Sequence, residues 1–187
     1  MPRRARELWY ALAAGLVVTA LYVAAYLQAG AFPAASGLVG HGIGILGSIL
    51  ILMTATLYSV RKLLTDARWG NVAAWLRFHM VTGLVGPYMV LLHTAMKFQG
   101  LAGLTMLLTV IVVASGLVGR YLYTAVPRTV DGVAAGARGP DRRREKLAAR
   151  RRAAATWHIV HVPLTWALFA AAFVHIVAAL YYATLQR

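Results

Sequence analysis

Four histidines recur at one spacing in two apolar stretches of the chain. His79 and His93 are fourteen residues apart, and His161 and His175 repeat that interval. Fourteen residues are nearly four helical turns, so the second imidazole of each pair returns to within about 40° of the first. At about 1.5 Å per residue, the two rings lie about 21 Å apart along the axis. Each stretch therefore offers two potential iron ligands on one helix face, at two levels.

The stretches that hold these histidines are long enough to cross a membrane. The chain has 187 residues, 60% of them hydrophobic, and its mean hydropathy is +0.67. A membrane helix needs about 20 apolar residues. We therefore predict an all-α integral membrane protein, with residues 1–187 forming a single domain. Its five transmembrane helices are predicted at about 8–28, 38–60, 75–96, 101–123 and 156–184.

The basic residues predict how these helices are oriented. Of the 19 Lys and Arg residues, 17 fall before residue 8 or within 61–77 and 120–152, which five helices place on one side. The positive-inside rule then predicts a cytoplasmic N-terminus and an outer C-terminus in the plasma (inner) membrane. The first helix could alternatively be a signal peptide, but its apolar region exceeds the usual length of about 7–15 residues. We therefore expect that helix to be retained.

In a chain of net charge +14, nine of the 19 basic residues fall in the basic cytoplasmic loop predicted at about 124–155. Strong helix formers at 141–155 can extend the fifth helix into that loop. We favour a role for the loop as a topology determinant on anionic headgroups. Docking of an acidic electron-donor protein is the alternative. The charge therefore indicates membrane lipid as a partner and gives no reason to expect nucleic acid.

The predicted topology makes the third and fifth helices parallel. His79 then faces His161 near the inner surface, and His93 faces His175 near the outer surface. Haem iron accepts axial imidazoles from both sides. The sequence therefore predicts two bis-histidine haems stacked across the membrane, within a bundle of the second to fifth helices. Because the chain has no cysteine, it lacks the C-x-x-C-H motif of covalent attachment, and we expect non-covalent haem b.

Four further residues lie at the edges of these predicted sites. His158 is the main rival to His161 as the inner ligand, and is otherwise a partner for a haem propionate or the backbone. His41 can contact the outer haem, handle a quinol proton or lie among headgroups. Arg77 and Arg120 stand at the inner rim, where propionates need cations, although topology alone also explains them. A single intramembrane histidine can simply bond to a neighbouring helix, but four in matched register favour ligands.

This histidine pattern resembles the ferric reductase-like transmembrane domain family, which includes the NADPH oxidases and carries its ligands on the third and fifth helices. The runner-up is the cytochrome b subunit of quinol–cytochrome c reductases, which has an H-x13-H pair on each of two helices. The likeness covers the predicted second to fifth helices. It implies that His79 and His161 hold the inner haem, and His93 and His175 the outer. A sixth helix and a fused flavin domain are common in the first family, and a PEWY-like signature marks the second. This sequence shows none of these, nor a Gly-rich nucleotide loop.

We therefore expect transmembrane electron transfer through two b-type haems, in the membrane subunit of a quinone-linked or reductase-linked oxidoreductase. The partner would be quinol or a separate flavoprotein, iron–sulfur protein or multihaem cytochrome. One alternative is a terminal reductase of ferric chelates, oxygen or superoxide at the outer haem edge. Another is a non-redox metal transporter or scaffold. Transporters normally carry intramembrane carboxylates, whereas all five acidic residues here lie on the predicted cytoplasmic side.

Overall fold

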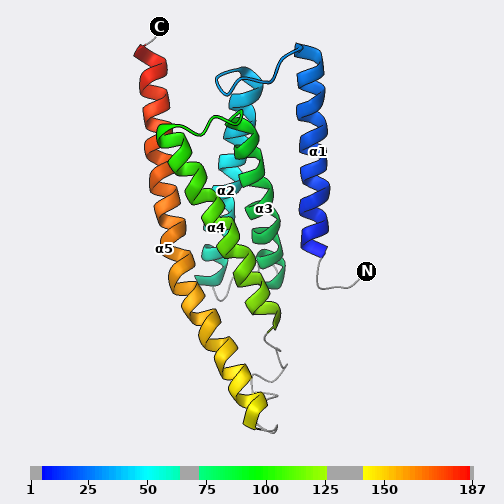
Figure 1. The fold of residues 1–187 in the computed structure, drawn as a ribbon, viewed down its shortest axis with the longest axis vertical. Helices are drawn as coiled ribbons and strands as arrows, with labels where there is room; N and C mark the ends of the chain where they lie inside the picture. Colours follow the sequence, from blue (N-terminus) through cyan, green and yellow to red (C-terminus); the bar gives the residue numbers. More distant parts are fainter. Residues whose placement is uncertain (1–5, 64–71, 126–140, 186–187) are drawn as a thin grey trace.

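The computed structural model describes residues 6–63, 72–125 and 141–185, and within these ranges the chain is all-α (Figure 1). Its five helices are α1 (Arg6–Ala29), α2 (Leu38–Leu63), α3 (Val72–His93), α4 (Gly100–Ala125) and α5 (Asp141–Leu185). They alternate in direction along one long axis, so that α1, α3 and α5 run parallel to one another and antiparallel to α2 and α4 (Figure 1). The parallel course of α3 and α5 is the arrangement that paired histidines require.

Most helix ends fall within three residues of the prediction, and two of the differences have a clear local cause. α3 ends at His93, three residues early, because Ala95 and Met96 adopt left-handed backbone angles, with φ of 47° and 61°, which end a helix. α5 begins at Asp141 instead of about 156, so residues 141–155 are helical. Their Ala, Arg, Lys, Glu and Leu content favours that conformation. The rest of the predicted basic loop, residues 126–140, lies outside the described residues.

Four of the described helices are long and apolar enough to cross a membrane: α1, α2, α4 and α5, whose apolar segment lies within residues 148–182. The remaining predicted span is α3, and the mean hydropathy of its apolar stretch is lower than that of these four. Arg77, His79 and His93 interrupt its apolar residues. α3 packs against α1, α2 and α4, and a helix shielded by neighbours can carry polar groups that a lipid-facing helix cannot.

Large apolar side chains cover the outside of the bundle. Leu16, Leu21, Val110, Trp166 and Leu180 are all more than half exposed. A soluble protein rarely exposes so much contiguous apolar surface. These side chains are suited to contact with membrane lipid.

The closest helix pairs are α2 with α3, and α4 with α5. Where α2 crosses α3, a Cβ atom added to Gly47 would lie 2.9 Å from the carbonyl oxygen of Gly86, so only two small residues allow this approach. Close by, the Thr54 hydroxyl donates to the Thr82 hydroxyl at 2.6 Å. Small residues and a buried hydrogen bond therefore fix α2 against α3.

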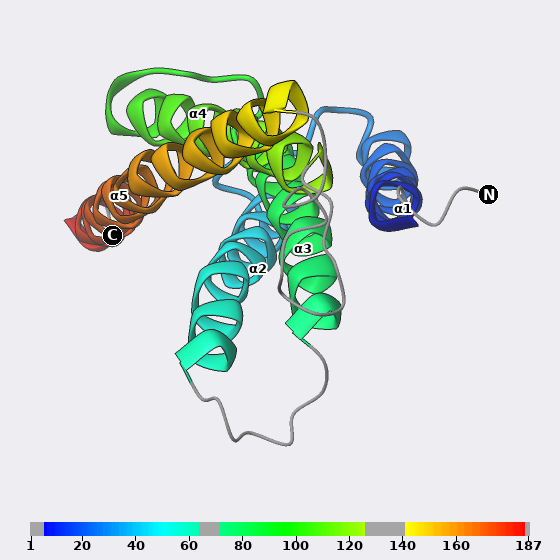
Figure 2. The same cartoon turned by 90° about the horizontal axis from the view of Figure 1, so that it is seen from below.

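α1 joins the bundle mainly along α3 and stands apart from α5 (Figure 2). Ala11 packs with Val85 and Met89 of α3 in the buried core. At the start of α1, the buried Glu7 carboxylate accepts a hydrogen bond from Arg120 of α4 at 2.8 Å. An apolar contact and an ion pair thus hold α1 to two different helices.

Candidate histidine site

The two histidines of α3 are held in the same way. The His79 Nδ1 atom lies 2.7 Å from the carbonyl oxygen of Thr54, and the His93 Nδ1 atom lies 2.8 Å from that of Gly40. Both carbonyls belong to α2, and both imidazoles are half-buried. α2 therefore supplies one main-chain acceptor at each level.

These hydrogen bonds decide which ring nitrogen carries the proton. A carbonyl oxygen can only accept, so Nδ1 must be the donor in both rings. Nε2 of the neutral ring then carries a lone pair. Histidines that ligate metals usually make this second bond from the opposite nitrogen. His79 and His93 are therefore oriented and protonated as ligands should be.

A glycine makes room for the His93 ring. A Cβ atom built on Gly44 would lie 2.7 Å from the His93 Cγ and Nδ1 atoms, closer than real side chains approach. Because the imidazole occupies the place where a side chain would stand, any larger residue at 44 would displace it. At Gly44, the close approach that glycine permits is therefore an approach to a candidate ligand.

His161 is positioned by the α4–α5 contact. Its Nδ1 atom lies 3.0 Å from the Ser115 hydroxyl of α4. Its ring stacks on Trp157, with 4.9 Å between centroids and 25° between planes. The Trp157 indole in turn donates to the Ser115 carbonyl oxygen at 2.7 Å. Ser115 therefore anchors both aromatic rings.

His175 has a looser environment than the other three. It is half-buried, but within residues 6–63, 72–125 and 141–185 no hydrogen bond to its ring is found. Its clearest relation is electrostatic, because a charge on its ring would interact with one on His93. His161 stands in the same relation to His79.

Among the four histidines, these electrostatic relations join His79 to His161 and His93 to His175. Each pair contains one residue of α3 and one of α5. The helices run parallel, so the two pairs lie at two levels along the bundle. Joint ligation by each pair stays a prediction.

The two remaining histidines of the candidate set are exposed. His158 lies edge-on to Trp157, with 6.2 Å between ring centroids. His41 lies edge-on to His93, at 6.3 Å. Exposure makes His158 less suited than His161 to be a ligand, and the ring contact places His41 beside His93.

The two candidate arginines have different surroundings. Arg120 is paired with Glu7, through its Nε and Nη2 atoms, at 3.1 and 2.8 Å. Its guanidinium is thus already engaged by a carboxylate of the chain itself. Arg77 is exposed on α3.

Several groups that shape the site escape a reading of the sequence. The acceptors for His79 and His93 are main-chain carbonyls, which carry no residue signature. Neither Ser115 nor Trp157 gave a signal by type or spacing that pointed to the site. Tyr58 of α2, whose ring centroid is 5.2 Å from that of His79, was equally unmarked.

Comparison with family models, curated proteins and solved structures finds no match for this chain. Its function must therefore be inferred from its own residues.

Proposed function

We propose that this protein transfers electrons across a membrane through two non-covalent b-type haems, held by His79 with His161 and by His93 with His175. In this proposal α2 to α5 form the haem-binding bundle, and α3 crosses the membrane together with the four more apolar helices. The positive-inside distribution of Arg and Lys supports a cytoplasmic N-terminus in the plasma (inner) membrane. Quinol or a separate redox protein supplies or accepts the electrons.

One observation carries the proposal. Two histidines fourteen residues apart on α3 each donate from Nδ1 to a carbonyl of α2. A single packing histidine can make one such bond, but the same bond at two levels fourteen residues apart is what a pair of ligands needs. The bond frees Nε2 and fixes the ring plane.

The residues of the site fit a haem in donor type and in surroundings. Neutral imidazole is a usual axial ligand for haem iron. Gly44 and Gly116 lie beside His93 and His161, where a Cβ atom would touch the ring. When bound, the haem iron supplies the one-electron chemistry, whereas the chain binds, orients and insulates the cofactor.

The first test is an absorption spectrum of the detergent-purified chain, oxidised and reduced, with a pyridine-haemochrome assay. We expect about two haems per chain, the bis-histidine number for four ligands. His175→Ala and His93→Ala should each reduce the content to about one, whereas the exposed His41→Ala should leave it at two. A colourless wild-type chain, or an unchanged content in His93→Ala, would defeat the proposal.

A second candidate is a terminal reductase that acts at the outer centre, and the environment of His175 favours it. A ligand without a second hydrogen bond is held less firmly, so an external molecule can compete for its position. Carbon monoxide tests this directly. Binding to the reduced wild type at about one molecule per two haems would support a reductase, and no spectral change would leave electron transfer alone.

A further inference from the structure

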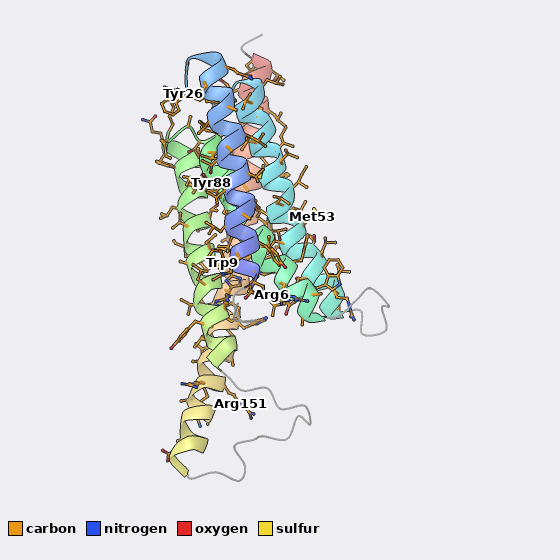
Figure 3. The ribbon with its side chains drawn as sticks, turned by 90° about the vertical axis from the view of Figure 1, so that its right-hand side faces the viewer. Arg6, Trp9, Tyr26, Met53, Tyr88 and Arg151 are labelled. Carbon is orange, nitrogen blue, oxygen red and sulfur yellow. The ribbon has the colours of Figure 1, made fainter. Side chains whose placement is uncertain are left out.

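α5 is much longer than a membrane span. Its 45 residues extend about 68 Å, whereas the hydrocarbon core is about 30 Å thick. The lower part of α5 reaches past the ends of its neighbours (Figure 1), and Arg151 lies on this part (Figure 3). We call residues 141–156 the basic extension.

The basic extension carries seven basic and two acidic residues: Arg142, Arg143, Arg144, Lys146, Arg150, Arg151 and Arg152, with Asp141 and Glu145. At about 100° per residue, the basic positions fall on all sides of the helix. Arg150, Arg151 and Arg152 are exposed. The charge therefore surrounds the helix and does not form a stripe.

This distribution does not suit a helix lying on lipid. Interfacial helices bury one apolar face of Trp, Phe or Leu. The basic extension has a single large apolar residue, Leu147. A helix that is polar all round is typically surrounded by water.

The length of the basic extension leads to the same conclusion. Trp157 follows it and is the kind of residue that marks the membrane interface. Sixteen residues before that point rise about 24 Å along the axis. The far end of the basic extension, near Asp141, then stands farther from the headgroups than the Debye length of about 8 Å, where lipid charge is screened.

We propose that the basic extension is a docking post for an acidic, soluble electron-carrying protein. This inference rests on the proposed function and adds the partner's class and the place where it binds. Charge complementarity steers such a partner toward the post from solution. The partner then meets α5, the helix that also carries His161 and His175.

The first experiment locates the basic extension. The chain has no cysteine, so single cysteines at the exposed positions Ala148, Ala149 and Ala153 can be spin-labelled without a background. In vesicles with and without phosphatidylglycerol, we expect all three labels to collide equally with a water-soluble nickel complex. A label at the exposed Ala170 is the lipid-facing control. Anionic lipid that buries one of the three would overturn the proposal in favour of a membrane-bound helix.

The second experiment measures docking, with reduced and oxidised acidic flavodoxin as the probe. The triple variant R150E/R151E/R152E should weaken flavodoxin binding by at least about tenfold at low salt, because it reverses charge at the contact. R3E/R4E/R6E changes the net charge equally and should have less than about a twofold effect. Equal losses in both variants, or wild-type binding that does not weaken with salt, would contradict docking at this place.

The two proposals fail in distinguishable ways. Neither the spin-label measurement nor the flavodoxin-binding measurement uses haem as its signal. A haem-free chain that still binds flavodoxin through residues 150–152 would defeat the electron-transfer proposal and retain the docking post. A chain that holds two haems but does not bind flavodoxin would retain the electron-transfer proposal and defeat the docking proposal.

Discussion

The α2–α3 pair and the α4–α5 pair each contribute two candidate ligands, but they hold them differently. In the first pair, both histidines donate to main-chain carbonyls, and glycines bring the helices close together. In the second, His161 relies on a serine hydroxyl, and no hydrogen bond to His175 is found within the described ranges. One half of the site is therefore built into the backbone, and the other depends on side chains.

Such a difference between the two pairs would let the site first admit a cofactor and then hold it. A main-chain acceptor inside a helix cannot move without breaking the helix, so the α3 rings are set before any ligand arrives. The α5 rings have more freedom to turn. The α2–α3 half would therefore receive the haem, and the α4–α5 half would close on it.

The largest expected effect comes from crowding a ring in each half. Gly44→Ala places a Cβ atom 2.7 Å from the His93 ring, which must then leave the Gly40 carbonyl. We expect about one haem per chain instead of two, measured by pyridine haemochrome. The matched change Gly116→Ala meets His161 only at 3.8 Å, an ordinary contact, and should retain both. Equal losses in the two variants would remove the distinction between the halves.

A smaller effect should follow from separating α2 and α3. Gly47→Ala would bring a Cβ atom within 3.0 Å of Met89 and 2.9 Å of the Gly86 oxygen. Overpacking of this kind costs about 1–3 kcal/mol, so the free energy of unfolding in detergent should fall by that amount. Gly42→Ala is the control, since its Cβ atom would enter open space. A stable Gly47→Ala variant would show that the pair is less rigid than its geometry indicates.

Removing a side-chain hydroxyl should weaken haem binding only in the α4–α5 pair, where a side chain holds the candidate ligand. Ser115→Ala deletes the partner of His161, a loss of about 0.5–1.5 kcal/mol, and the inner haem should dissociate about 2–10 times faster. Transfer of haem to apomyoglobin measures that rate. Thr54→Ala loses the bond to Thr82 but keeps the carbonyl that holds His79, so its haem should dissociate at the wild-type rate. Faster loss from Thr54→Ala would mean that the side chain also positions the ring.

The smallest effect concerns the protein without its cofactor. Amide hydrogen exchange reports local opening. In the haem-free chain we expect faster exchange in the 157–180 region of α5 than in the 76–93 region of α3. Addition of haem should slow exchange in α5 more than in α3. Identical protection in both states would contradict closure of the α4–α5 half.

The sequence predicted the helices well because apolar length and charge position are direct properties of residue type. Five helices form, and the chain alternates in direction as the basic segments indicated. The prediction was less accurate where local conformation decides, as at Ala95 and Met96, whose left-handed angles end α3 early. That α3 also crosses the membrane stays a prediction, because the mean hydropathy of its apolar stretch is lower than that of the other four helices.

The site was predictable only in part. The spacing of the four histidines identified the candidate ligands, because a helix converts sequence interval into position. It could not identify the carbonyls of Gly40 and Thr54, since any residue offers one. Nor could it foresee that Arg120 pairs with Glu7, because their contact joins residues 113 positions apart. The haem ligation itself stays a prediction.

That ion pair has a consequence for biogenesis. Glu7 leaves the ribosome 113 residues before Arg120, an interval of roughly 6–23 s at about 5–20 residues per second. Throughout it, a carboxylate destined for burial has no partner from its own chain and must be hydrated or shielded by the insertion machinery. Closure of the pair would therefore mark the moment when the first and fourth helices have both arrived.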